Sequence, residues 1–512
     1  MTRLGLVART TLLTLALTTA LLAGPAGAGG IGWSAPDLGT PALGRVSGID
    51  ATACPTAGHC VALGATMSEI FAVTQRGRGW SAPVVVARGL YEPVVTSLAC
   101  PAVGACSAGG YIATAAPVAF TLDEAGGHWG SLDQLAPVAG ANGGGTSVTA
   151  VACAQAGSCV AIGQGGTPGE TGGPVFVDVE TAGTWGPESP VGTLVGDSGT
   201  PTAGVAAACV TDGPCTVAGE YSSNTLLDGN GGNMNEPFVD TETGGTWASP
   251  VALTGWPALN LATLPIFGGP DVSPWPTSLS CPAAGACVVV GAYGTNARPG
   301  LDGFSPFVDI ESNGTWGTPT TIPPVDARNT SSYGTAEAVS CASATTCDVA
   351  GLYSSQHVYH SFIIPETAGR WGALTSIPWP PATLPGDTGH QRGSVFIQGL
   401  GCPRVGACAW WGSMTTQTET GQNLWPGEGV VIPPPGQAIV GTLIGGHLTF
   451  SRVVAPAGVG GTLFGDSLVG GACATRVLAC ATGGGWVYRA TTPGTPTRLP
   501  VGYVRYFVLA LG

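Results

Sequence analysis

The feature that most constrains this chain is a pair of cysteines that recurs eight times along its 512 residues. Seven pairs are spaced C-x5-C and the last is spaced C-x6-C, and a glycine stands four residues after every second cysteine. One short pattern repeated at intervals of 46 to 72 residues indicates repeated supersecondary units. The pairs are Cys54/Cys60, Cys100/Cys106, Cys153/Cys159, Cys209/Cys215, Cys281/Cys287, Cys341/Cys347, Cys402/Cys408 and Cys473/Cys480, and the glycines are Gly64, Gly110, Gly163, Gly219, Gly291, Gly351, Gly412 and Gly484.

Each cysteine pair predicts a β-hairpin. In the stretch SLSCPAAGACVVVGAYG, which begins at Ser278, a loop of proline, alanine and glycine joins two runs that suit β-strands. Residues that flank a tight turn face each other across the ladder, close enough for a disulfide. We therefore expect one disulfide in each pair, which would fix the register of its hairpin. The glycine of the second strand predicts the close approach of another backbone.

A second hairpin alternates with the first. It reads VFVDVETAGTWGPE, PFVDTETGGTWASP, PFVDIESNGTWGTP and SFIIPETAGRWGAL in four of the units. An alternating strand ends there in an acidic, glycine-containing turn and restarts at a tryptophan, so each unit has four strands. In the seventh unit Leu448 stands where tryptophan is expected. The tryptophans of the other units are Trp80, Trp129, Trp185, Trp247, Trp316 and Trp371.

The two ends of the chain favour a closed ring over an open array. The last unit has a third strand, YVRYFVLALG, but no tryptophan strand after it, whereas the sequence around Trp33 is a tryptophan strand with no partner before it. An N-terminal strand that completes the last sheet would close the ring and protect the sheet edges. The sequence therefore predicts an all-β, eight-bladed β-propeller of four-stranded blades. A seven-bladed ring with one divergent unit outside it and a solenoid are the alternatives.

Residues 1–28 are predicted to be a secretory signal peptide, and residues 29–512 a single propeller domain. Arg3 and Arg9 precede a short apolar run, and Ala26, Gly27 and Ala28 form an A-x-A cleavage signal. A membrane anchor is the alternative, although the apolar run is shorter than the roughly 20 residues that a span needs. No later stretch is long and apolar enough to span. Sixteen cysteines in an exported chain indicate disulfides and a secreted or cell-envelope location.

The charge of the chain excludes some partners. Its net charge is −14 at pH 7, it contains no lysine, and no arginine lies between Arg88 and Arg298. Nucleic acids and anionic lipids are bound through cationic footprints, so neither is an expected partner. We expect a monomer that binds a glycan or a secreted protein.

The tryptophan turns resemble the Asp-box turn of sialidase-like and BNR-repeat propellers, which has the form S-x-D-x-G-x-T-W. Three turns match its end, and acids stand at Glu180, Glu242 and Glu311 in place of the serine and aspartate spacing of the motif. The cysteine hairpin is similar to repeats in secreted bacterial propeller proteins. The resemblance implies a propeller, and a sialidase-like site would imply clustered arginines with a Tyr/Glu nucleophile pair. The matching residues are Gly183, Thr184, Trp185, Gly245, Thr246, Trp247, Gly314, Thr315 and Trp316.

Several residues are candidates for catalysis or metal binding. Carboxylate pairs two apart on a strand share one face, but their repetition favours solvated hairpin ends over a catalytic site. These pairs are Asp178/Glu180, Asp240/Glu242 and Asp309/Glu311. Asp228, Asn230 and Glu236 offer oxygen ligands that would suit Ca²⁺, although the EF-hand spacing is missing. Apart from this calcium candidate, we expect no cofactor. The arginines Arg298, Arg328, Arg370, Arg392 and Arg404 fall in successive later units, and we expect them to be scattered over the surface.

Aromatic residues in the long connections are the candidates for ligand binding. Tyr221, Tyr293 and Tyr353 follow the repeated glycines, and Arg298, Trp411 and Trp425 lie in later units. The alternative for these aromatic residues is local packing within the long loops. The leading hypothesis is an exported, non-catalytic binding module for cell-envelope glycan or a secreted protein. The alternative is an extracellular polysaccharide hydrolase or lyase. A binding module should present aromatics and amides at the channel mouth, whereas an enzyme should present converging carboxylates.

Overall fold

The computed structural model describes residues 37–38, 47–77, 79–136, 138, 145–165, 173–194, 200–227, 233–256, 273–298, 301–330, 333–355, 358–378, 392–404, 406–417, 437–453, 463–464, 468–474, 478–488 and 503–511. All of them belong to one compact unit, Trp33–Gly512. The predicted signal peptide lies outside the described residues. Within them, no helix is long and apolar enough to cross a membrane. One helix is described there, α1 (Pro323–Asp326).

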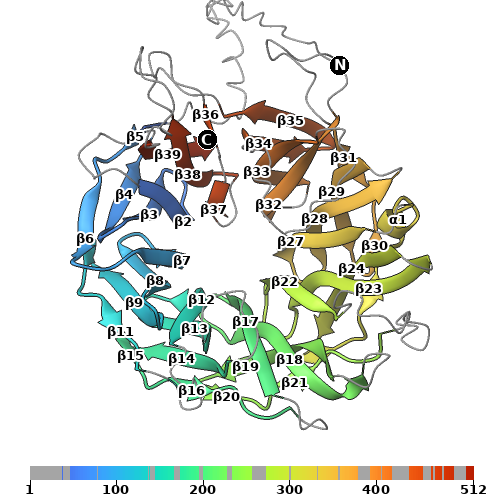
Figure 1. Cartoon of the computed structure of the whole chain (residues 1–512), viewed down its shortest axis with the longest axis horizontal. Coiled ribbons are helices and arrows are strands. Elements are labelled where there is room, and N and C mark those ends of the chain that lie inside the picture. The colour runs from blue at the N-terminus through green and yellow to red at the C-terminus, as the bar shows by residue number, and fades with distance from the viewer. Residues whose placement is uncertain are drawn as a thin grey trace, which may run out of the picture. The chain divides into compact units, whose positions relative to one another are not determined.

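Eight antiparallel sheets stand around a common axis, as the cysteine repeat predicts (Figure 1). The prediction of an eight-bladed β-propeller is therefore confirmed. The cysteine strand of each blade is innermost and lines the centre of the ring. These first strands are β2 (Ser47–Thr56), β7 (Pro93–Ala102), β12 (Thr146–Gln155), β17 (Thr200–Cys209), β22 (Trp275–Ser280), β27 (Gly334–Ser343), β32 (Arg392–Arg404) and β37 (Leu468–Cys473).

The second and third strands follow outward in the predicted order. The second strands carry the repeated glycine and are β3 (His59–Thr66), β8 (Ala105–Ile112), β13 (Ser158–Gly165), β18 (Cys215–Leu227), β23 (Val288–Arg298), β28 (Thr346–Ser355), β33 (Ala407–Gln417) and β38 (Cys480–Tyr488). The third strands are β4 (Glu69–Arg76), β9 (Val118–Ala125), β14 (Val175–Thr181), β19 (Asn233–Thr243), β24 (Leu301–Ser312), β29 (Val358–Thr367), β34 (Gln437–Ile444) and β39 (Tyr503–Leu511).

The outermost strand of blades 1 to 6 is split into two short pieces, both paired with the third strand. The first piece contains the tryptophan: β5 (Gly79–Trp80), β10 (His128–Trp129), β15 (Thr184–Trp185), β20 (Thr246–Trp247), β25 (Thr315–Trp316) and β30 (Arg370–Trp371). The second pieces are β6 (Val84–Arg88), β11 (Asp133–Gln134), β16 (Ser189–Pro190), β21 (Val251–Ala252), β26 (Thr320–Thr321) and β31 (Thr375–Ile377). Blade 7 has a continuous outer strand, β35 (His447–Arg452).

The N-terminal strand closes the ring. β1 (Asp37–Leu38) pairs with β39, with Asp37 opposite Val508 and Leu38 opposite Phe507. β1 is thus the outer strand of blade 8, which also contains the short β36 (Leu463–Phe464) beside β38. Closure by the N-terminal segment is confirmed, and the pairing residues lie four and five positions after Trp33, which is outside the described residues.

All eight predicted disulfides are present, one in the hairpin of the first two strands of each blade. In blades 1, 2, 3, 5, 6 and 7 the turn between the third and outer strands lies beside the disulfide loop, and a backbone hydrogen bond joins the two turns. The amide of Gly183 donates to the carbonyl of Gly157 over 3.1 Å, for example. We call the side of the ring that carries these turns the disulfide face.

The sequence predicts that each disulfide fixes the register of a hairpin. In the structure the disulfides also form part of the packing between blades. The second cysteine of each pair is buried and packs against apolar side chains of the preceding blade, so it is part of the hydrophobic core. Cys106, Cys159 and Cys287 are each 2% exposed, and Cys347 is 3% exposed. The spacing of the cysteines could not indicate this burial, because it depends on contacts with another blade. The other buried second cysteines are Cys60, Cys215, Cys408 and Cys480.

A bulge in the first strand explains the repeated glycine. In blade 2 the ladder shifts register between Val95 and Ser97, which makes Thr96 the bulged residue. A Cβ on Gly110 would lie 2.0 Å from the carbonyl oxygen of Val94, so no larger residue fits. The ring of Phe120, directly opposite Gly110 in the third strand, covers the space that the missing side chain leaves.

The hydrophobic core lies between the blades, and it is continuous around the ring. Neighbouring blades enclose a cluster of buried apolar side chains, and this includes blades 8 and 1, where Cys54, Cys60 and Ala481 pack together. Bulged residues add polar links. Thr96 donates to the carbonyl of Val148 in blade 3, and Thr277 donates to that of Ala336 in blade 6, over 2.8 and 2.6 Å.

Candidate functional site

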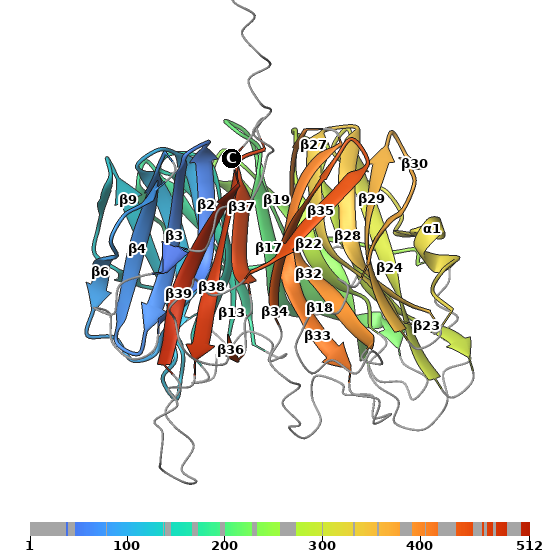
Figure 2. The same ribbon diagram turned by 90° about the horizontal axis from the view of Figure 1, so that it is seen from above.

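The second and third strands join at the side opposite the disulfide face, which we call the connection face. It lies toward the arrowhead of β33 in Figure 2. Blades 1 to 3 end their second strands two residues after the repeated glycine, at Thr66, Ile112 and Gly165. Blade 4 continues for eight residues to Leu227, and blade 5 for seven to Arg298. Blades 6 and 7 continue for four and five residues, to Ser355 and Gln417. Five additional residues extend a strand by about 17 Å, so this face is raised over the half of the ring formed by blades 4 to 7, and most over blades 4 and 5.

At the foot of the raised half, five aromatic rings form a continuous row across blades 5, 6 and 7. Trp275 contacts Phe304 with ring centroids 5.0 Å apart, and Phe304 contacts Tyr333 at 5.6 Å. Tyr333 contacts Tyr359 at 5.2 Å, and Tyr359 contacts Phe396 at 6.3 Å. The first three pairs are edge-to-face. Phe304 is buried, whereas the other four rings are half-buried. We call these five residues the aromatic row.

The fold places each ring of the row at the connection face. Trp275 is the first residue of β22, and Phe396 has the equivalent position in β32, six residues before the first cysteine of its blade. Tyr333 immediately precedes β27 and bridges to Phe304 of the neighbouring blade. Asn329 fixes this junction, because its Nδ2 donates to the carbonyl of Phe304 over 3.1 Å and its Oδ1 accepts from the amide of Tyr333 over 2.9 Å.

Polar groups of blades 6 and 7 accompany the row. Glu337 is the bulged residue of β27, and Thr335 donates a hydrogen bond to its carboxylate. Burial raises the pKa of Glu337, so its carboxyl is neutral over a wider pH range than an exposed one. The pKa of Tyr333 is raised to about 12. Burial is the largest cause, and the charges of Glu337 and Tyr359 add to it. Gln398, the bulged residue of blade 7, is exposed. The row therefore combines apolar faces with a carboxyl, phenol and amide.

The three candidate tyrosines are not part of this row. Tyr221, Tyr293 and Tyr353 occupy equivalent positions in blades 4 to 6, two residues after the glycine, and are only 1%, 3% and 6% exposed. Tyr221 donates to the carboxylate of Glu236, and Tyr353 stacks on the ring of His360 with centroids 5.2 Å apart. In this conformation they support the blades from within, and their role in ligand binding stays a prediction.

The remaining candidates are dispersed. Trp411 is 4% exposed and packs between blades 7 and 8, where Gly399 and Gly471 leave room for its indole. Trp425 lies outside the described residues, as do two calcium candidates, Asp228 and Asn230. Glu236 is buried, and its carboxylate accepts the hydroxyl of Tyr221. Arg298 is the last residue of β23, opposite Leu301, at the tip of the long hairpin of blade 5.

The repeated carboxylate pairs are not solvated hairpin ends, so that prediction is wrong. Asp178, Asp240 and Asp309 are 1%, 4% and 1% exposed. Asp178 shares its strand face with Glu180, and that face packs against the preceding blade. Burial is the largest cause that raises the pKa of Asp178 and Asp240 to about 7 and that of Asp309 to about 6. Each has one oxygen without a hydrogen-bond partner.

The paired glutamates hold the turns and the blade interfaces. Glu242 accepts a hydrogen bond from the amide of Gly245 in the tryptophan turn. Glu180 accepts from the hydroxyl of Ser107 in the preceding blade over 3.2 Å. These bonds explain why the acid recurs before the tryptophan without serving catalysis.

The cysteines belong to the core and not to the candidate site. Cys106, Cys159, Cys287 and Cys347 are oxidised and buried between blades, as are their equivalents in the other four blades. A disulfide sulfur is not a thiolate, so it offers neither a nucleophile nor a metal ligand. Their contribution is therefore to stability alone.

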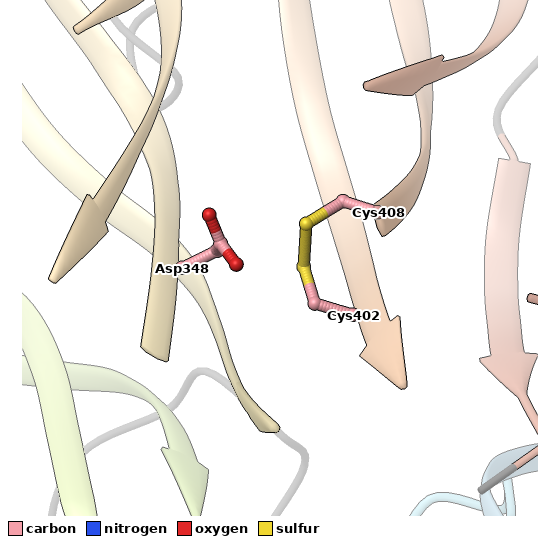
Figure 3. Close-up of side chains that lie close together, drawn as sticks. All are labelled: Asp348, Cys402 and Cys408. Atoms are coloured by element: carbon pink, nitrogen blue, oxygen red, sulfur yellow. A yellow bond between two sulfur atoms is a disulfide. The ribbon is translucent and has the colours of Figure 1, made fainter. Parts of the chain in front are cut away.

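One further side-chain group has donor atoms close enough for a metal ion. Asp348 of β28 faces Cys402 and Cys408 of blade 7, and their donor atoms lie within 4.8 Å of one another (Figure 3). The two sulfurs are bonded to each other, so neither is a thiolate ligand. The residues present therefore do not make a metal site. Asp348 is 2% exposed, and burial alone raises its pKa to about 6.

Sequence reasoning missed most of the aromatic row. Its members come from five strands and connections of three blades, and only Trp275 stands out as an extra tryptophan in a long connection. The equivalence of Trp275 and Phe396, both six residues before a first cysteine, is the signal that could have indicated two of them.

No protein-family model matches the chain, and no curated protein matches it in sequence. Similar solved structures include the WD40 repeats of RRP9, with 9% identity over 81% of this chain and 94% of that chain and a TM-score of 0.40. The polysaccharide lyase Uly1 is 10% identical over 80% and 88%, with a TM-score of 0.42. A PL25 ulvan lyase is 8% identical over 83% and 97%, with a TM-score of 0.40. Identities this low carry no activity from one chain to another.

Proposed function

We propose that this protein is an exported, disulfide-stabilised propeller that binds a glycan on the connection face of blades 5 to 7, without catalysis. The observation that carries the proposal is the aromatic row, with four half-buried rings beside an exposed amide. Aromatic rings provide the apolar platforms on which sugar rings stack, and amides and hydroxyls pair with sugar hydroxyls.

One further feature supports export, and another supports binding over catalysis. Eight disulfides persist in an oxidising compartment outside the cytoplasm. Glycan hydrolysis needs two carboxylates about 5 to 10 Å apart across a cleft. The carboxyl that acts on Tyr333 of the row is Glu337, and burial raises its pKa. The row is therefore better suited to holding a sugar chain than to cleaving it.

The proposal is tested by a glycan-array screen of the chain from residue 29, together with assays for new reducing ends and for unsaturated products. We expect binding without release of either product. Tyr333→Ala and Tyr359→Ala should each weaken binding about 5- to 150-fold, since loss of a stacking ring costs roughly 1–3 kcal/mol. Tyr91→Ala is the matched control, because Tyr91 is 61% exposed on the same face but lies between blades 1 and 2.

The thermal unfolding midpoints of these variants show whether each still folds. Product release by the unaltered chain would support a hydrolase or lyase and contradict the proposal. Binding that the Tyr333 and Tyr359 variants retain in full, while both remain folded, would place the glycan elsewhere.

A further inference from the structure

The few arginines of this acidic chain are not spread evenly over the connection face. Blades 2, 3 and 4 lie in the stretch between Arg88 and Arg298, which contains neither arginine nor lysine. Arg298, Arg328 and Arg392 then follow in blade 5, in the connection to blade 6 and in blade 7. These are the blades that carry the aromatic row.

The backbone places all three at the rim of the row. Arg298 pairs with Leu301, which lies three residues before Phe304 in β24. Three residues of a β-strand span about 10 Å, so the backbone of Arg298 is about that far from Phe304 along the hairpin. Arg392 begins β32, four residues or about 13 Å before Phe396. Arg298 lies at the tip of the blade 5 hairpin, and Arg392 pairs with Gln417 at the connection-face end of blade 7.

Arg328 is the third member of this group. It follows α1 and immediately precedes Asn329, whose side chain joins Phe304 to Tyr333. The Arg328 side chain is exposed. By contrast, Arg370 begins β30 and Arg404 ends β32, so both lie beside the turns of the disulfide face, although they belong to blades 6 and 7.

From this placement we infer that the glycan is anionic, with carboxylate or sulfate groups that the arginines at the rim pair with while sugar rings stack on the aromatic row. The inference rests on the proposed function and names the class of its ligand. Arginine pairs with carboxylate and sulfate in a bidentate geometry, and exposed pairs of this kind steer an anionic ligand to an otherwise repulsive protein. Three arginines are too few to bind a nucleic acid, but they suit a glycan chain that carries one negative charge in every one or two sugars.

The test uses an array of uronate-containing and sulfated glycans, each beside its carboxyl-reduced or desulfated counterpart. We expect binding to an anionic member and at least about tenfold weaker binding to its neutral counterpart. Raising NaCl from about 50 to about 500 mM should weaken binding of the anionic member, because salt screens exposed charges. Binding of a neutral glycan with equal or higher affinity would overturn this inference alone. Absence of binding to every member would overturn the proposed function as well.

Substitutions locate the charge effect. The triple variant Arg298→Gln, Arg328→Gln, Arg392→Gln should lose about tenfold in affinity and most of its salt dependence. The control variant Arg370→Gln, Arg404→Gln removes two exposed charges from the disulfide face of the same blades and should bind like the unaltered protein. Asp302→Asn, which removes an acid from the Arg298 hairpin, should strengthen binding. Equal weakening by the triple and the control variants would show that net charge, and not this rim, attracts the glycan.

Discussion

Asp348 gives the sharpest prediction about stability, because its carboxyl is buried against a disulfide of the next blade. Replacing it by asparagine keeps the shape of the side chain and removes its titration. Burial raises the pKa of Asp348 from 3.8 to about 6, and no neighbouring charge contributes. At pH 8, where the carboxyl is ionised in both the folded and unfolded chain, this difference corresponds to a cost of about 3 kcal/mol.

The sign of the effect depends on pH. A folded-state pKa above the unfolded value means that the folded chain binds more protons between about pH 4 and pH 6, so stability is lost as pH rises through that range. Asp348→Asn should therefore stabilise the protein by about 2–3 kcal/mol at pH 8 and by less than about 1 kcal/mol at pH 4. Ser107 and Thr216 occupy the equivalent positions of blades 2 and 4 beside the disulfides of the following blades, so Asp348→Thr should be tolerated as well.

The assay is urea unfolding at pH 4, 6 and 8 with the disulfides intact, followed by tryptophan fluorescence. Trp410 of the adjoining blade is fully buried and will report on this interface. Asp212→Asn is the control, because Asp212 is an exposed turn residue with φ of 54°, which asparagine tolerates. A variant that is destabilised at pH 8, or that shifts equally at pH 4 and pH 8, would refute the reasoning.

Three further outcomes follow from the fold. The unaltered protein should lose stability as pH rises from about 4 to 8, measured as its urea midpoint, because burial raises the pKa values of Asp50, Asp178, Asp240 and Asp309. Gly110→Ala should destabilise by about 1–3 kcal/mol through its clash with the carbonyl of Val94, whereas Gly130→Ala, whose Cβ would have no atom nearer than 3.6 Å, should not. A chain that begins at residue 45 lacks β1 and leaves β39 as an open edge, so it should melt at lower temperature and self-associate in size-exclusion chromatography.

The architecture could be predicted from the sequence because each structural need recurs in every blade. The disulfide beside a tight turn requires two cysteines at a fixed spacing, and the bulge requires a glycine at a fixed position after them. The strands without partners at the two ends of the chain indicate that the ring closes. Glu180 shows where this reasoning stops. Its hydrogen bond to Ser107 comes from the neighbouring blade, so burial of the acid depends on a contact 73 residues away.

The candidate site could not be predicted in the same way because it is the part of the ring that departs from the repeat. Tyr333 and Tyr359 lie in one blade, but their partners Phe304 and Phe396 lie in the blades on either side. The long hairpin of blade 5 is visible in the sequence only as a longer interval between cysteines. Such irregular features carry no periodic signal, and only the ring brings them together.

Backbone amide hydrogen exchange, with and without the oligosaccharide that binds best on the array, tests the central claim most directly. We expect the ligand to slow exchange at the connection face of blades 5 to 7, in peptides that cover residues 301–305, 329–337, 358–361 and 392–398. Protection confined to blades 1 to 3, or to the turns of the disulfide face, would contradict that claim.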